Sequence, residues 1–252
     1  MTAQPRRAAL DAVKARIRAL ETGVGGRVEN RATVGLGDKA LDRGLPWGGL
    51  PRAALHEIRG DAAAAGFTAA LAARLAGSDG TVLWCQSRAE AHEAGRLHGP
   101  GLGAFGLDSR RLVVVTAGPG AEVLWVLEEG FRSAGIAVVV AEGGAPDLTA
   151  SRRLQLAAEA GGATGLVLTP GEAPAGPSAA LTRWRVAPAP SAAVTLSPGL
   201  MGPARWDVAL WRCRGGGPGH WIVDWDATAL RFRLVAALAD RPASPGDVRR
   251  SA

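Results

Sequence analysis

Cysteine, lysine and long apolar runs are all scarce in this chain of 252 residues. Two cysteines occur, Cys85 and Cys213, and they form no CxxC pair. Neither a disulfide framework nor a metal site is therefore predicted, and Cys85 is interpreted as a core residue. The longest uncharged apolar runs, 112–118 and 136–141, are far shorter than the roughly 20 residues that a membrane span needs.

The near-absence of lysine means that the positive charge is carried by arginine. The net charge is +6, and Lys14 and Lys39 are the two lysines. Because arginine-rich usage also accompanies a GC-rich genome, the charge is not taken as evidence for DNA binding, although it suits an acidic partner. Charged residues interrupt the stretch from Leu10 to Leu20, which is unlike a signal peptide. We expect a cytoplasmic protein, associated with the nucleoid when in complex.

The N-terminal segment carries an amphipathic pattern. Residues 7–22 place four apolar side chains on one helical stripe, namely Leu10, Val13, Ile17 and Leu20. A glycine-rich stretch follows at 23–26, so a tethered helix is predicted, with the stripe as a partner-binding candidate. The predicted organisation is a helix and linker over 1–40, a core domain over 41–239 and a disordered tail over 240–252.

The core alternates short apolar runs with helical patterns. Strands are predicted at 54–58, 81–85, 112–116, 136–140 and 165–168, and helices at 67–76, 88–97, 121–132 and 148–160. This alternation is typical of an α/β fold with a parallel sheet covered on both faces. Further strands are predicted at 181–186, 206–214, 220–225 and 231–235. The glycine-rich segment 212–221 favours a hairpin, so the sheet should end in antiparallel strands.

Residues 45–75 resemble the strand, loop and helix of a P-loop nucleotide site. That site requires GxxxxGK[ST], whose backbone amides and lysine hold the phosphates. Here Gly60 and Gly66 are separated by five residues, Phe67 stands in the lysine position, and Thr68 keeps the hydroxyl. Because a phenylalanine supplies no charge, we interpret this segment as a degenerate nucleotide loop and expect no ATP cofactor.

Several segments resemble the core of the RecA recombinase and, more closely, the ImuA family. They are LDRGLPWGGLPRAALHEIRG (41–60), FGLDSRRLVVV (105–115), LTASRRLQLAAEAGGATGLVLT (148–169), TRWRV (182–186) and RCRGGGPG (212–219). The resemblance covers most of 40–235 and implies a RecA-like core. It also implies a damage-induced protein that acts with an ImuB-like, polymerase-related partner and an error-prone C-family DNA polymerase.

Two other parts of a RecA-like ATPase site are also missing. Ala141 stands where the acid that ends the Walker B strand is expected. Glu142 follows one place later and is either a displaced acid or, more simply, a loop residue. No acid stands at 86–88, where the resemblance places the activating glutamate. Three combined losses favour a protein that is not an enzyme.

Candidate contact residues gather in two other places. Arginine alternates with tryptophan near the C-terminus, at Arg183, Arg185, Trp211, Arg212 and Arg214. Three interpretations stay open, namely a sheet with tryptophan inside and arginine in solvent, a protein interface, and single-stranded DNA binding. The alternation places Arg212 and Arg214 on one sheet face.

Arg152 and Arg153 stand early in a predicted helix, where the positive dipole end disfavours arginine, so they are partner-binding candidates. His92 and His98 are six residues apart, which does not place them on one helix face, and no metal site is predicted.

The leading hypothesis is a non-catalytic adaptor of SOS-induced, error-prone translesion DNA synthesis. Its implied partners are the ImuB-like protein, the C-family polymerase and RecA, and direct DNA contact stays open. Two alternatives from other classes remain, a cell-division inhibitor like SulA and a weak DNA-stimulated ATPase of the RecA superfamily.

Overall fold

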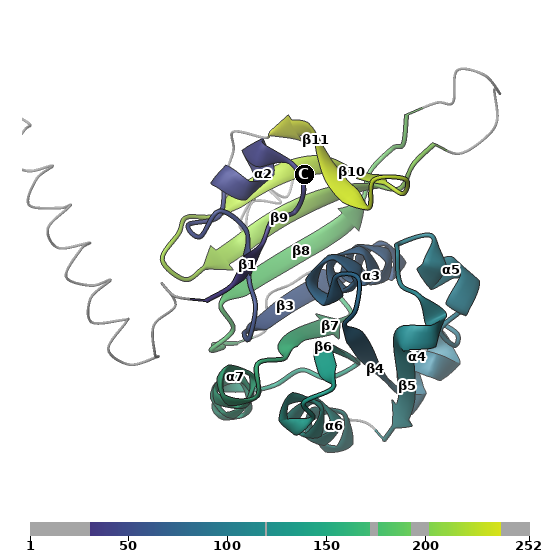
Figure 1. The fold of residues 1–252 in the computed structure, drawn as a ribbon, viewed down its shortest axis with the longest axis vertical. Coiled ribbons are helices and arrows are strands. Elements are labelled where there is room, and N and C mark those ends of the chain that lie inside the picture. Colours follow the sequence, from purple (N-terminus) through teal and green to yellow (C-terminus); the bar gives the residue numbers. More distant parts are fainter. Residues whose placement is uncertain (1–30, 119, 172–175, 193–201, 238–252) are drawn as a thin grey trace, which may run out of the picture.

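A computed structural model describes residues 31–118, 120–171, 176–192 and 202–237. Within these ranges the chain builds one large sheet and a small two-stranded sheet (Figure 1). The helical segments are α2 (Lys39–Arg43), α3 (Ala62–Ala76), α4 (Arg88–Glu93), α5 (Gly99–Gly103), η2 (Ser109–Arg111), α6 (Ala121–Arg132) and α7 (Leu148–Gly161). The strands are β1 (Thr33–Val34), β2 (Leu50–Pro51), β3 (Leu55–Gly60), β4 (Thr81–Ser87), β5 (Leu112–Ala117), β6 (Ile136–Glu142), β7 (Thr164–Thr169), β8 (Thr182–Pro188), β9 (Arg205–Cys213), β10 (Gly219–Asp226) and β11 (Arg231–Ala237).

The large sheet has nine strands in the order β11-β10-β9-β8-β3-β7-β6-β4-β5. In this order, adjacent strands between β8 and β5 pair in parallel. Adjacent strands between β11 and β8 pair antiparallel. The predicted α/β class with antiparallel C-terminal strands is confirmed. The predicted hairpin is also confirmed, because β9 and β10 pair directly across the turn.

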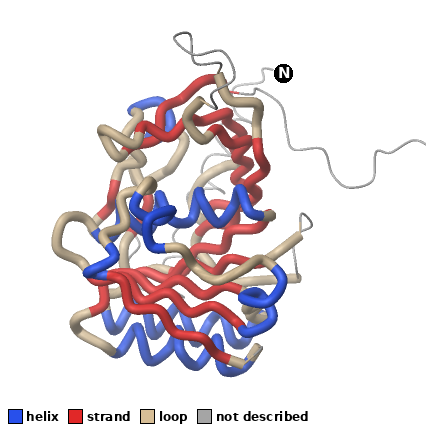
Figure 2. Tube along the Cα trace, turned by 90° about the vertical axis from the view of Figure 1, so that its right-hand side faces the viewer, coloured by secondary structure: helices blue, strands red, loops and turns tan. Residues whose placement is uncertain are grey.

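Helices cover the parallel part of the sheet from both sides (Figures 1 and 2). One face packs against α3, whose alanine-rich sequence lets it approach β3, β6, β7 and β8 closely. The opposite face packs against α6 and α7, which also contact each other. Each face has its own apolar cluster, centred on Phe67 and Trp184 on the α3 side and on Phe131 and Leu154 on the other.

The edge strand β5 departs from the expectation that the parallel strands are covered on both faces. Val113 is 45% exposed and Val114 is 50% exposed. These valines point to opposite faces, because side chains alternate along a strand. The helix predicted at 88–97 is shorter than expected and ends at Glu93.

The residues before β3 also pack on the core. Leu36 and Leu41 are buried in the cluster on the α3 side. The Nε–H of Arg74 in α3 donates a hydrogen bond of 2.8 Å to the backbone oxygen of Gly35. The predicted N-terminal helix with Leu10, Val13, Ile17 and Leu20, and the predicted tail, lie outside the described residues. No helix among the described residues has the length and apolar composition to cross a membrane.

Candidate functional site

The connection between β3 and α3 is one residue long. Gly60 ends the strand, Asp61 follows, and α3 begins at Ala62. The Asp61 side chain accepts a hydrogen bond of 2.9 Å from the backbone N–H of Ala63, which is an N-cap contact. Gly60 has φ +151°, and a Cβ there would overlap Val186 O of the neighbouring strand. The chain therefore turns directly from strand to helix without an open loop.

This geometry contradicts the prediction of a degenerate nucleotide loop. That prediction covered Gly60, Gly66, Phe67 and Thr68. Gly66, Phe67 and Thr68 all lie within α3, and Gly60 belongs to β3. The Thr68 hydroxyl donates to Ala64 O at 2.7 Å, one turn earlier. Five residues between the glycines had suggested a loop, but the alanines at 62–65 are strong helix formers and extend α3 instead.

Phe67 is part of the hydrophobic core. It is 2% exposed, and its ring centroid lies 5.1 Å from that of Phe232 and 5.7 Å from that of Trp206. Aromatic rings at such separations stabilise each other beyond their buried area. The side chain in the expected lysine position thus points into the core.

A cavity of about 500 Å³ lies at the carboxyl ends of the parallel strands. This edge is where open α/β sheets generally bind ligands. The cavity is lined by the end of β3, the first turns of α3, β4, α4, the segment to α5, and the ends of β6 and β7. Its lining residues include Asp61, Trp84, Gln86, Glu90, Glu93, Arg96, Leu97, His98, Leu102, Phe105, Glu142 and Leu168.

Of the two interpretations of Glu142, a displaced acid at the end of the strand and a loop residue, the structure excludes the loop residue. It is the last residue of β6 and is 7% exposed. Trp84 Nε1 donates to Glu142 Oε2 at 3.1 Å. Burial raises the pKa of Glu142 above its ordinary value, and the nearby charge of Glu90 acts in the same direction. A carboxylate that ends a strand thus does line the cavity, one residue after Ala141.

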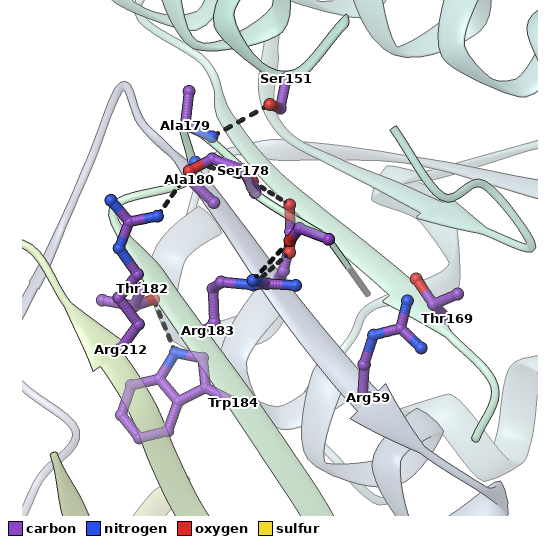
Figure 3. A network of polar contacts seen from close by, with 12 residues as sticks. Arg59, Ser151, Thr169, Ser178, Ala179, Ala180, Thr182, Arg183, Trp184 and Arg212 are labelled. Carbon is purple, nitrogen blue, oxygen red and sulfur yellow. Dashed lines mark hydrogen bonds and ion pairs between the residues drawn. The ribbon is translucent and has the colours of Figure 1, made fainter. Parts of the chain in front are cut away.

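The C-terminal arginines lie in a network of polar contacts (Figure 3). Arg183 Nε donates to Glu57 Oε2 at 2.8 Å, and the two side chains are 11% and 9% exposed. Ser178 also donates to Glu57, and Arg212 Nη1 donates to Ser178 O at 2.6 Å. Arg185 lies 3.7 Å from Asp207. These contacts join the strands to the segment that precedes β8.

The alternation predicted for β8 is confirmed, since Trp184 is buried and Arg183 and Arg185 are half-buried on the opposite face. The predicted pairing of Arg212 and Arg214 on one sheet face is wrong, because β9 ends at Cys213 and Arg214 lies in the turn. The register between β8 and β9 also shifts beside Trp211, which is half-buried. Trp206, Trp221 and Trp225 are buried.

Arg152 and Arg153 are exposed on α7. Arg153 Nε lies 3.1 Å from Glu128 Oε2 of α6. Leu156 is 62% exposed on the same helix, and Trp125 of α6 is 60% exposed. A large apolar side chain is therefore available on each of these neighbouring helices, a feature that the sequence patterns did not single out.

The remaining polar candidates have structural contacts. His98 follows α4 and caps α5, where Nδ1 accepts from Gly101 N at 3.2 Å. His220 Nε2 lies 2.6 Å from Asp207 Oδ1. Across the described ranges, no group of three or more histidine, cysteine, aspartate or glutamate side chains could hold a metal ion.

Comparison with curated proteins finds close relatives. The chain is 41% identical over 234 residues to Protein ImuA of two strains of Caulobacter vibrioides, NA1000/CB15N and ATCC 19089/CB 15. Each match covers 85% of this chain and 93% of the relative. No protein-family model matches the chain.

Proposed function

Because the chain belongs to the ImuA family, we propose that it is a non-catalytic adaptor in error-prone translesion DNA synthesis. Its core is RecA-like, with the nucleotide position closed. It acts with an ImuB-like protein and an error-prone C-family DNA polymerase, and RecA is a further partner. The chemistry of DNA synthesis belongs to the polymerase in this complex.

The observation that carries the proposal is the Asp61 cap of α3. A phosphate-binding loop needs free backbone amides at a helix N-terminus, and the helix dipole favours an anion there. Here the Asp61 carboxylate already accepts from Ala63 N–H, and no residue other than Asp61 separates β3 from α3. A triphosphate would meet a carboxylate and a closed turn.

Two further contacts support the same conclusion. Phe67 is packed among Trp184, Trp206 and Phe232, so the expected lysine position faces the core. Glu142, the acid nearest to the Walker B position, accepts from the indole of Trp84. Phe67 and Glu142 thus contact other side chains of this chain, at positions where a nucleotide-binding protein contacts the nucleotide or its magnesium ion.

The outer faces of α6 and α7 supply the surface for a protein partner. Trp125 and Leu156 are exposed there, together with Arg152 and Arg153. Tryptophan and arginine are the side chains that most often anchor protein interfaces. In this proposal Arg152 and Leu156 contact the partner, whereas Arg183 holds the core together.

The first experiment measures nucleotide binding by the purified chain. A fluorescent ATP analogue is titrated with Mg²⁺, and ATP hydrolysis is measured with and without single-stranded DNA. We expect no saturable binding and no hydrolysis. DNA-stimulated turnover would overturn the non-catalytic proposal in favour of the weak ATPase.

The second experiment measures complex formation with the ImuB-like protein and the C-family polymerase. Tagged chain is captured from DNA-damaged cells and then reconstituted with purified partners, with and without Mg-ATP. We expect the same complex in both conditions, weakened by Leu156→Asp and retained by Ala229→Asp, which adds the same charge in the exposed turn between β10 and β11. Failure to bind either partner, together with filamentous cells on overexpression, would favour the SulA-like inhibitor instead.

A further inference from the structure

The cavity at the carboxyl ends of the strands has a charge opposite to that of the whole chain. Four carboxylates line it, from Asp61, Glu90, Glu93 and Glu142, against one arginine, Arg96. The complete chain carries a net charge of +6. Coulomb repulsion therefore disfavours a phosphate in this cavity, and a cation is attracted to it.

The carboxylates are placed at two depths. Glu142 is 7% exposed at the end of β6, whereas Asp61 and Glu93 are exposed. Glu90 is half-buried, and its charge acts on Glu142 directly. A cation that enters from solvent would meet the exposed carboxylates first and Glu142 last.

Local structure explains why Glu90 and Glu142 are close. The Ser87 hydroxyl caps α4 by accepting from Glu90 N at 3.1 Å, which places the first turn of α4 beside the end of β6. Gly143 follows Glu142 with φ +84°, and a Cβ there would lie 2.8 Å from Glu90 Cγ. Glu90 can therefore lie close to Glu142 because Gly143 has no side chain.

The rest of the lining is apolar. Leu97, Leu102, Phe105 and Leu168 contribute to the wall, and Trp84 lies beside Glu142. A volume of about 500 Å³ falls within the range of sites that bind small ligands or a few side chains. An occupant must therefore carry a positive group for the carboxylates and an apolar body for the wall.

We propose that this cavity binds a guanidinium or ammonium group carried on an apolar body, supplied by an arginine or lysine side chain of a partner polypeptide. The choice of a polypeptide rests on the proposed adaptor function. The choice of a cation rests on the carboxylates and the apolar wall alone. The position that binds an anionic nucleotide in related folds would here hold a cationic side chain.

The test titrates the purified full chain with benzamidine and with benzoate, which have the same ring and opposite charge. The indole N–H resonance of Trp84 reports on binding by NMR, because this group donates to Glu142, and Trp84→Phe assigns it. We expect benzamidine to shift this resonance saturably and benzoate to leave it unchanged. Equal shifts with both probes, or a shift with benzoate alone, would overturn the proposal.

Variants connect binding to the carboxylates. Glu142→Gln and Glu93→Gln should each weaken benzamidine binding about tenfold, the loss that roughly 1.4 kcal/mol produces. Glu93 is exposed, so its variant keeps the test valid even if Glu142→Gln disturbs folding. Glu129→Gln, on the outer part of α6, is the matched control and should bind normally. Unchanged affinity in the folded cavity variants would contradict the proposal.

A competition experiment identifies the source of the cation. Saturating benzamidine should weaken the complex with the ImuB-like protein, whereas benzoate should not. If benzamidine binds the chain but leaves that complex intact, the polypeptide source is wrong. If no complex forms at all, the adaptor function is wrong. The benzamidine titration of the chain alone still decides whether the cavity binds a cation.

Discussion

The ring of Phe67 lies 5.1 Å, centroid to centroid, from the ring of Phe232. This contact joins the middle of α3 to the last described strand of the sheet, more than 150 residues later in the chain. The residue that takes the lysine position in the sequence pattern is therefore a structural link between two distant elements. Restoring a lysine at this position would damage the core and leave the phosphate position closed.

Phe67→Lys should lower the free energy of unfolding by about 3 kcal/mol or more, since it removes a buried aromatic ring and adds an unpaired charge. Urea denaturation measures this loss, and the ATP analogue should still fail to bind. Phe67→Leu, which keeps most of the apolar volume, should cost about 1 kcal/mol. A Phe67→Lys protein that is stable and binds ATP would show that α3 can open into a loop.

Asp61→Ala tests the cap of α3. Loss of the side-chain acceptor for Ala63 N–H should reduce stability by about 1 kcal/mol, measured as a lower urea midpoint. Asp61→Asn keeps a capping oxygen and should retain most of the stability. ATP should bind neither variant, because Gly60 and Val186 O still close the turn. Saturable ATP binding by Asp61→Ala would mean that the carboxylate alone blocks the site.

Arg183→Ala and Arg152→Ala should separate a structural arginine from a partner-binding one. Arg183 pairs with Glu57, and both side chains are largely buried, so its loss leaves a buried carboxylate without its cation and should cost about 3 kcal/mol. Arg152 is exposed, so its loss should leave stability within about 0.5 kcal/mol and weaken partner binding. Urea denaturation and partner titration of both variants measure this difference. The reverse result would place the interface on the arginines of β8.

The sequence predicts the sheet well because burial in a parallel sheet leaves a strong pattern. All nine predicted strands of the core are found, with ends shifted by up to two residues. Runs such as 136–140 are apolar on both faces, and helices do cover both faces of β6. Tryptophan and arginine alternate in β8 because one face packs on α3 and the other does not.

Sequence patterns mislead where a local signal competes with the spacing of a known motif. Aspartate followed by four alanines at 61–65 is a helix start signal, but the flanking glycines favoured a loop. Glu142 follows the apolar run 136–140 and the expected acid position, which favours a loop residue, and its partner Trp84 is 58 residues away in the sequence. Exposure of β5 depends on its place at the sheet edge, which no pattern within the strand reveals.

His56 should make stability depend on pH. Its Nε2 donates to Pro51 O at 2.9 Å, and Nδ1 accepts from the Thr182 hydroxyl at 2.7 Å, so the neutral ring is fully paired. Burial lowers the pKa of His56 from 6.5 to about 4. Since the unfolded chain then binds a proton more readily than the folded one, stability is lost as the pH falls from 6.5 to 4.

At about 1.4 kcal/mol per pKa unit, this loss should reach roughly 3 kcal/mol at pH 4. Urea denaturation between pH 7 and pH 4 measures it. His56→Gln should be less stable at pH 7 but should show a smaller loss on acidification. His92→Gln, at an exposed position on α4, should keep the slope of the parent chain. An unchanged slope in His56→Gln would assign the acid sensitivity to other groups.

The apolar stripe predicted at residues 7–22 gives a separate test of docking, because the sequence predicts it on a tethered helix outside the core domain. Ile17→Asp places a charge in the centre of the stripe of Leu10, Val13, Ile17 and Leu20. Transfer of a carboxylate into an apolar interface is costly, so binding to RecA or the ImuB-like protein should weaken at least tenfold. The free energy of unfolding of the core should stay the same.

Ala15→Asp is the matched control, since helical periodicity places residue 15 opposite the stripe while the added charge is identical. Partner titration should show normal binding for this variant. Weakening by both variants to the same extent would mean that net charge, and not the apolar stripe, controls binding. Normal binding by both would exclude the stripe and leave the exposed face of α6 and α7, with Trp125 and Leu156, as the contact surface.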